Sequence, residues 1–232
     1  MMNVILKQAY FLFTLVLICS ISACGSSGVV DTVDDEDFTL TSDEQGREDA
    51  LKLLLTEEVY NTITAASSNN ASCRESNRAE LGLSDLPNGQ WYYTYDNLIF
   101  GMAQMEEFAS ESADDNINKL EIAAFLANIA QETGTGIEVE PTYGGPGCFI
   151  QEIGKYGSTD YNSSACGVDY TCAAAGYFGR GPHQLSWDSN YKSFSEMMGV
   201  GLEYLTDPDI LTTDPEIGIA GSIWFWGHVV TS

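Results

Sequence analysis

The amino-acid sequence predicts a mainly α-helical domain, and two features carry that prediction. Apolar residues recur at helical spacing in several separate stretches, whereas the alternation of apolar and polar residues typical of strands is scarce. No internal repeat is visible. With the N-terminal segments set aside, about 180 of the 232 residues remain, enough for one domain with a substantial core.

The first 24 residues have the layout of a secretory signal. An apolar run from Tyr10 to Ile21 follows a short start containing Lys7, and this run is too short for a confident membrane span. Cys24 follows two small residues and resembles the lipidated cysteine of a bacterial lipobox; an ordinary cleaved signal is the alternative. We therefore expect an exported protein, either a cell-envelope lipoprotein that meets the membrane only through its lipid, or a secreted one.

Residues 25–49 are small, polar and acidic, and they predict a flexible tether because they offer too little apolar surface to offset the entropy of ordering. Residues 50–232 are left as one predicted domain, expected to be monomeric. The whole chain has 34 acidic and 9 basic residues, a net charge of −25. This acidity disfavours nucleic acid and anionic lipid as partners, whereas a neutral polysaccharide remains compatible.

The first helix is predicted over Leu51 to Ala66, with Thr56 as a capping residue before Val59 and Ile63. In the stretch 91–108, four apolar residues fall on one helical stripe. Such a stripe predicts core rather than a binding surface: Leu98, Ile99, Met102 and Met105.

A further helix begins at the polar cluster 114–116 and carries an apolar face made of Ile122, Phe125, Leu126 and Ile129. At about 100° per residue, Glu132 falls roughly 70° from the centre of that face and stands just before Gly134. A carboxylate at this margin can lean over a cleft whose wall is the helix itself.

The last predicted helix starts at Asp214, the expected N-cap, with Pro215 in the first turn. It is expected to carry three residues inward: Ile217, Ala220 and Trp224. Trp224 and Trp226 are therefore predicted as core residues.

Four cysteines fall within the predicted domain: Cys73, Cys148, Cys166 and Cys172. An even number in an exported chain indicates two disulfides. Zinc is the competing interpretation, but no CxxC spacing exists and the two histidines lie elsewhere. We expect no metal and no cofactor.

Glu132 and Glu152 stand near the two ends of a glycine-rich loop that runs from Thr133 to Gln151. Glycoside hydrolysis needs a carboxyl pair, about 6.5–9.5 Å apart in inverting enzymes and about 5–5.5 Å apart in retaining ones. Because the chain has 34 acidic residues, their spacing alone does not select this pair.

Five segments in the same order change that: YYTYD (92–96), EIAAFLANIAQETGTG (121–136), CFIQEIG (148–154), GYFGRGPHQLSWDSNY (176–191) and LTTDPEIGIAGSIWFW (211–226). Together they resemble the family 19 glycoside hydrolases, the chitinases best known from plants. The resemblance implies a lysozyme-like, mainly helical fold of two lobes. It also implies internal cleavage, with inversion, of β-1,4-linked N-acetylglucosamine polymers, so that chitin or its oligosaccharides would be the binding partner.

The resemblance assigns roles to single residues. Glu132 would be the general acid that protonates the glycosidic oxygen, and Glu152 the base that activates water. Ser186 would position that water. Three further residues would contact the sugar, Gln184 and Asn190 by hydrogen bonds and Tyr177 by stacking, although a loop or cap role is equally open for Asn190.

The resemblance also implies the disulfide pairs Cys73–Cys148 and Cys166–Cys172. Arg180, which stands between two glycines, is expected to be a structural organiser that pairs with a carboxylate near the site.

Three departures from the family pattern leave other functions open. The usual histidine before the acid is Gln131, and the usual threonine two positions after it is Gly134. The chain stops at Ser232, where family members continue with further sugar-binding residues, so the second lobe is expected to be incomplete. The alternatives are a peptidoglycan-cleaving hydrolase and a non-catalytic chitin-binding remnant.

Overall fold

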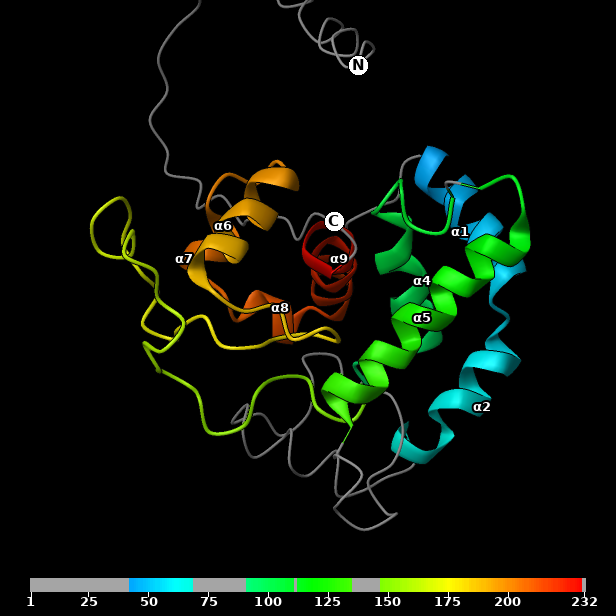
Figure 1. The fold of residues 1–232 in the computed structure, drawn as a ribbon, viewed down its shortest axis with the longest axis horizontal. Helices are drawn as coiled ribbons and strands as arrows, with labels where there is room; N and C mark the ends of the chain where they lie inside the picture. The colour runs from blue at the N-terminus through cyan, green and yellow to red at the C-terminus, as the bar shows by residue number, and fades with distance from the viewer. Residues whose placement is uncertain (1–41, 69–90, 111, 135–146, 231–232) are drawn as a thin grey trace, which may run out of the picture. The chain divides into compact units, whose positions relative to one another are not determined.

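Helix α4 (Tyr95–Ala103) packs against helix α9 (Pro215–Phe225) in the computed structural model (Figure 1). The structure describes residues 42–68, 91–110, 112–134 and 147–230, all of which belong to one compact unit. The two helices meet at Gly101, where an added Cβ would lie 2.5 Å from Ile219 Cγ2. Only a glycine permits this approach.

The remaining helices surround that pair. Helices α1 (Ser42–Leu54) and α2 (Glu57–Ser68) contact α4, and the long helix α5 (Asp115–Thr133) contacts α1. On the other side of α9 in Figure 1 lie the short helices of the later chain, α6 (Asp188–Met197), α7 (Glu203–Thr206) and α8 (Ile210–Thr213). A π-helix, η1 (Trp226–Val230), continues α9.

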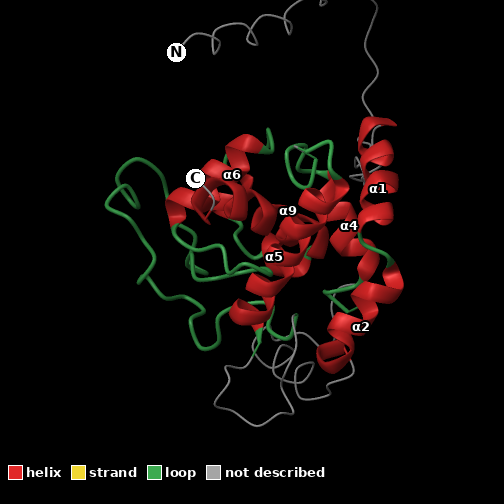
Figure 2. Cartoon of the chain, turned by 45° about the vertical axis from the view of Figure 1, so that its right-hand side comes forward, coloured by secondary structure: helices red, strands yellow, loops and turns green. Residues whose placement is uncertain are grey.

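Within the described ranges, Figure 2 shows helices and loops, and the pairing outside helices is limited to isolated bridges. The predicted mainly α-helical class is confirmed.

The predicted apolar faces form the core. The predicted stripe is at most 8% exposed, although its last residue, Met105, lies just after α4 ends. The four apolar residues predicted on α5 are also buried. Asp114 caps α5, since its carboxylate accepts from the backbone N–H of Asn116 at 2.9 Å. Asp214 caps α9 by accepting from the N–H groups of Glu216 and Ile217. Both helix starts are where the sequence predicted them.

The prediction of a tether over residues 25–49 is wrong for its last part, because α1 begins at Ser42. Leu51 is part of the hydrophobic core, and Arg47, one turn earlier on the same acidic helix, contacts the end of α4. The guanidinium of Arg47 donates to five carbonyl groups at and after the end of α4: Met102, Ala103, Met105, Glu106 and Phe108.

A single helix over residues 51–66 is also wrong, since α1 ends at Leu54 and α2 starts at Glu57. Tyr60 and Thr64 are the buried side chains of α2, whereas Val59 and Ile63 are exposed. The break is held by Tyr95, whose hydroxyl donates to the carbonyl of Leu55 at 2.7 Å.

The inward face of α9 is shifted from the predicted one. Ile219, Ala220 and Ile223 are buried, while Ile217 and Trp224 are half-buried against the core. The neighbouring Trp226 is buried, as predicted.

The described residues do not include the predicted signal with Cys24, the first part of the tether, or Cys73. What the sequence predicts for them therefore remains a prediction. Within the described ranges, none of the helices combines the length and apolar character needed to cross a membrane.

Candidate active site

Glu132 is an exposed residue in the last turn of α5. The helix ends at the next residue, Thr133, which is fully buried and hydrogen-bonded both to the helix and to the segment after it. Its hydroxyl donates to the carbonyl of Ile129 at 2.5 Å and accepts from the N–H of Gly147 at 2.8 Å, and its carbonyl accepts from the N–H of Phe149 at 3.0 Å. The end of α5 is thereby joined to the segment that leads to Glu152.

Gly147 makes this junction sterically feasible. It has a φ of +81°, and an added Cβ would lie 2.7 Å from the ring of Tyr93. Tyr93 in turn donates a 2.5 Å hydrogen bond to the carbonyl of Phe149. The adjacent Cys148 is in a disulfide, but its expected partner Cys73 lies outside the described residues, and that pairing remains a prediction.

Glu152 is fixed by a short ladder of backbone hydrogen bonds. Its N–H donates to the carbonyl of Gly179 at 2.8 Å, and the N–H of Gly181 donates to the carbonyl of Ile150 at 2.8 Å. Since Phe149 is bonded to Thr133, only three residues of chain, about 10 Å when extended, separate the end of α5 from Glu152. The structure thus brings together the two segments that carry the predicted carboxylates.

The carboxylate of Glu152 is half-buried and accepts a 2.7 Å hydrogen bond from the hydroxyl of Tyr161. The N–H of Gly179 also points to it, at 3.5 Å. This bond to Glu152, together with burial, raises the pKa of Tyr161 to about 12. Tyr161 therefore stays protonated at physiological pH, and its hydroxyl is the hydrogen-bond donor to the side chain of Glu152.

Gln184 and Ser186 lie just before α6, and Asn190 lies in its first turn. Ser186 is half-buried, and its carbonyl accepts from the side-chain amide of Asn190 at 2.8 Å. The side-chain amide of Gln184 donates to the carbonyl of Gly181 at 3.0 Å. The local role that the sequence left open for Asn190 is therefore present, and contact of these residues with sugar remains a prediction.

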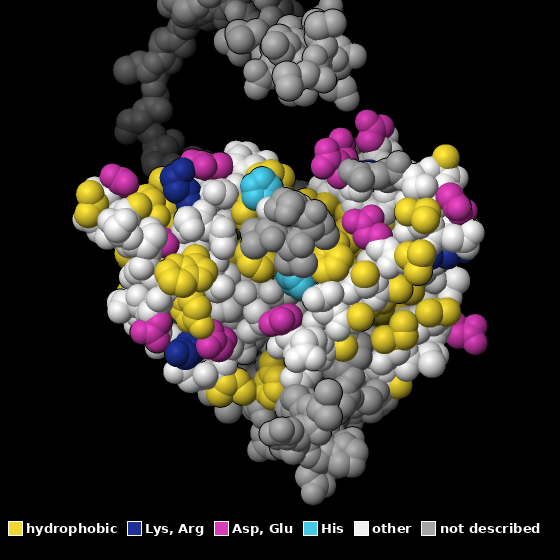
Figure 3. All heavy atoms as spheres, viewed as in Figure 1, with side chains coloured by type: hydrophobic (Ala, Val, Ile, Leu, Met, Phe, Trp, Pro, Cys, Tyr) yellow, Lys and Arg dark blue, Asp and Glu magenta, His cyan; other side chains and the backbone are white. Residues whose placement is uncertain are grey.

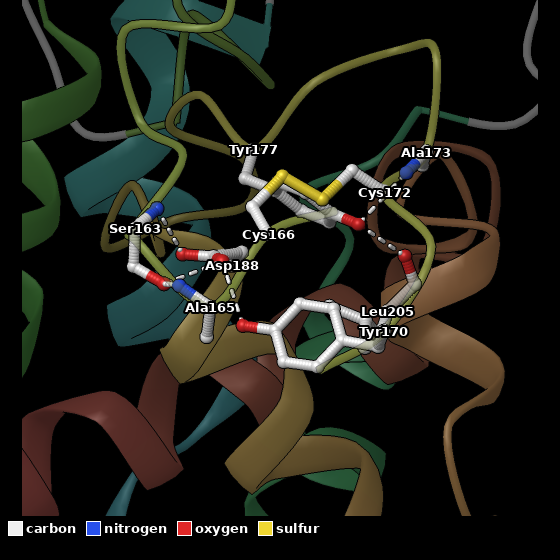
Figure 4. Close-up of a disulfide and its surroundings, with 9 residues drawn as sticks. All are labelled: Ser163, Ala165, Cys166, Tyr170, Cys172, Ala173, Tyr177, Asp188 and Leu205. Carbon is white, nitrogen blue, oxygen red and sulfur yellow. Dashed lines mark hydrogen bonds between the residues drawn. A yellow bond between two sulfur atoms is a disulfide. The ribbon is translucent and has the colours of Figure 1, made fainter. Parts of the chain in front are cut away.

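Tyr177 does not line a sugar site, which corrects the predicted stacking role. Its side chain is 0% exposed. Its hydroxyl donates to the carbonyl of Leu205 at 2.9 Å and accepts from the N–H of Ala173 at 2.8 Å (Figure 4). The buried tyrosine thus joins the loop at Ala173 to helix α7.

Figure 4 also shows a buried carboxylate that sequence reasoning missed, Asp188 at the start of α6. It accepts from the N–H and hydroxyl of Ser163, at 2.9 and 2.8 Å, and from the hydroxyl of Tyr170 at 2.6 Å. Burial opposes its ionisation, but these hydrogen bonds outweigh burial and hold the pKa of Asp188 below its usual range. Asp188 ties the loop that follows Tyr161 to α6.

The same loop contains the disulfide Cys166–Cys172, which confirms the second predicted pair. Tyr161 was missed as well, and nothing in its sequence neighbourhood distinguishes it from the other tyrosines.

Arg180 is a structural organiser, as predicted, and its carboxylate partner is Asp209 at 2.7 Å. The guanidinium is fully buried, lies 3.8 Å from the ring centroid of Phe178, and donates to the carbonyl of Gly176 and the hydroxyl of Tyr191. These contacts fix the strand-like turn that pairs with Glu152.

Three further features bear on the site. A cavity of about 620 Å³ lies where α4, α6 and α9 end, but none of the predicted site residues lines it. Across the described ranges, no group of three or more His, Cys, Asp or Glu side chains is arranged to hold a metal ion. Acidic side chains are spread over the face in Figure 3, and basic ones there are few, in keeping with the net charge.

Comparison with known proteins gives one consistent result. A glycoside hydrolase 19 family model, described as "Chitinase class I", matches residues 83–231. Chitinase 12 of Oryza sativa subsp. japonica is 36% identical over 138 residues, 58% of this chain and 41% of the relative. Endochitinase 2 of Gossypium hirsutum is 38% identical over 141 residues, 58% of this chain and 44% of the relative.

The chain therefore spans about two fifths of the length of the curated relatives it matches. Among solved structures, a family GH19 class IV chitinase from Zea mays has a TM-score of 0.55 at 24% identity, covering 77% of this chain and 73% of the other. This likeness supports the predicted lysozyme-like fold class.

Proposed function

The chain belongs to glycoside hydrolase family 19, the class I chitinases, and we propose that it cleaves chitin internally, with inversion at the anomeric carbon. The observation that carries this proposal is the junction of the two carboxylate-bearing segments. Thr133, next to Glu132, is hydrogen-bonded to Phe149, and Glu152 follows three residues later with its carboxylate oriented by Tyr161.

In the proposed reaction, the carboxylic acid of Glu132 gives its proton to the glycosidic oxygen as the bond to the anomeric carbon breaks. Glu152 takes a proton from a water molecule, whose oxygen attacks that carbon from the opposite face. Ser186 holds this water, and the amides of Gln184 and Asn190 bind the sugar. A bound chitin chain would cover the exposed Glu132 and remove it from solvent.

We also propose that the protein is exported and anchored by a lipid on Cys24, because the sequence before residue 25 has the layout of a lipoprotein signal. An anchored enzyme with a strongly acidic surface suits a neutral polysaccharide better than a polyanion.

The test compares the variants Glu132→Gln and Glu152→Gln with the wild-type protein on N-acetylglucosamine hexamer. Each variant should lose at least about a hundredfold in cleavage rate while binding the hexamer nearly as tightly, because Gln and Glu are close in shape. Glu196→Gln, a change in an exposed carboxylate paired with Lys192, is the matched control and should retain activity.

Three results would contradict the proposal. Folded wild-type protein that binds the hexamer without cleaving it would be a chitin-binding protein. Cleavage of peptidoglycan instead of chitin would identify the other polymer. Full activity of Glu132→Gln or Glu152→Gln would show that the pair is wrongly chosen.

A further inference from the structure

We infer that Trp187 is a sugar-stacking residue of the proposed active site and presents its indole to a pyranose ring of the bound chitin chain, beside the candidate base. This inference rests on the proposed function. All four tryptophans lie in the described residues, and Trp187, 45% exposed, is the only one of them that is an exposed side chain. The other three are buried or half-buried.

The backbone at Trp187 is one that a large L-residue adopts only with strain. Its φ is +75° and its ψ is 129°, a region that glycine occupies more readily. It also stands at the N-cap of α6 without a side-chain hydrogen bond, where Ser, Asp or Asn would stabilise the helix. The start of helix α6 therefore does not explain a tryptophan at this position.

The strained conformation is held from both sides. The N–H of Trp187 donates to the carbonyl of Tyr177 at 2.9 Å, and its carbonyl accepts from the N–H groups of Asn190 and Tyr191 at 2.9 and 3.2 Å. A side chain on such a fixed backbone loses little further freedom when a ligand binds it, which favours affinity.

The indole lies one aromatic ring away from the candidate base. It meets the ring of Tyr161 edge-to-face, with centroids 5.7 Å apart and an interplanar angle of 83°. The hydroxyl of that tyrosine is the group that donates to Glu152. Ser186, the preceding residue, and Asn190, one turn later, are the proposed water and sugar contacts, so Trp187 stands between them in the chain.

The chemistry of the ligand fits an indole. A pyranose ring presents apolar C–H groups on its faces, and a tryptophan offers a large, rigid apolar surface with a single N–H donor that an N-acetyl carbonyl can accept. A sugar ring stacked on the indole would bury surface that the described residues leave exposed.

The test measures binding of N-acetylglucosamine hexamer by the Glu132→Gln protein with and without Trp187→Gly. The Kd should rise roughly tenfold or more, since most of the apolar contact area is lost. In the wild-type background, Trp187→Gly should raise KM more than it lowers kcat. The same change relieves the positive φ but removes the ring contact with Tyr161, so the unfolding temperature should change little. A purely structural tryptophan predicts a lower one.

Tyr156→Ala is the matched control. Tyr156 is even more exposed, at 65%, but its hydroxyl donates to Asp209 rather than to the groups around Glu152. The Glu132→Gln protein that also carries Tyr156→Ala should have the same Kd for the hexamer as the Glu132→Gln protein itself.

The outcomes separate the two proposals. Suppose that the wild type cleaves the hexamer and that the Glu132→Gln protein binds it. Unchanged binding after the additional change Trp187→Gly would then overturn this inference alone. A fall in kcat with unchanged KM would also overturn it, because Trp187 would then act only through Tyr161. Absence of binding and cleavage in the wild type would overturn the proposed function, and this inference with it.

Discussion

The hydroxyl of Tyr161 donates a 2.7 Å hydrogen bond to the carboxylate of Glu152. This contact joins a residue that the family pattern identifies to one that only the structure shows. It orients the candidate base and is the largest cause of the rise in the pKa of Tyr161 to about 12.

Replacing Tyr161 by Phe should lower kcat on N-acetylglucosamine hexamer by about ten- to a hundredfold, because a hydrogen bond to a charged group is worth about 1.5–3 kcal/mol. KM should change less, since the ring and its contact with Trp187 remain. Steady-state kinetics measure both constants. Tyr156→Phe, which removes a more exposed hydroxyl bonded to Asp209, is the control and should keep the wild-type kcat.

Asp188→Asn should lower the free energy of unfolding at pH 7 by about 1–3 kcal/mol, because the amide cannot accept from Ser163 and Tyr170 as the carboxylate does. The pKa of Asp188 is depressed in the folded state, so its contribution is present above the unfolded value, about 4, and is lost as pH falls through the folded value. Urea unfolding at pH 7 and pH 3 should show a smaller difference between variant and wild type at pH 3. Equal differences at both pH values would contradict this.

His183 predicts a second acid-sensitive step at higher pH. It is buried against the rings of Phe125, Phe225 and Trp226, and burial lowers its pKa. Below about pH 6.5 the histidine is protonated in the unfolded chain but stays neutral in the folded one. The free energy of unfolding therefore decreases as the pH is lowered. His183→Phe should flatten the unfolding temperature between pH 7 and 5. A variant with the same pH slope as the wild type would show that another group is responsible.

Arg47→Ala tests whether α1 is part of the fold. Loss of the five bonds to carbonyls at and after the end of α4 should cost about 1–3 kcal/mol, because partly buried acceptors are left without their charged donor. Lys52→Ala on the same helix is the control, since its ion pair with Glu48 is a surface i, i+4 contact worth about 0.5 kcal/mol or less. Equal unfolding temperatures for the two variants would argue that α1 is not docked.

The sequence predicts the helices whose apolar faces repeat at 3.6 residues, and α4 and α5 are where it places them. The prediction fails for α1. This acidic segment docks through Arg47, whose guanidinium bonds to carbonyls at the end of α4, and no pattern in the segment itself shows that contact. The prediction also fails for Tyr177, since a family motif shows which residue is present but not how deeply its ring is buried. Tyr161 and Asp188 act through contacts with residues 9 to 25 positions away, which no local pattern reveals.

Proton NMR of the purified protein with N-acetylglucosamine hexamer tests the central proposal most directly, because it follows both the product and its anomeric form with time. If Glu132 and Glu152 act as acid and base on one water molecule, the first product released should be the α-anomer. Initial release of the β-anomer, or no product from folded protein, would contradict the account.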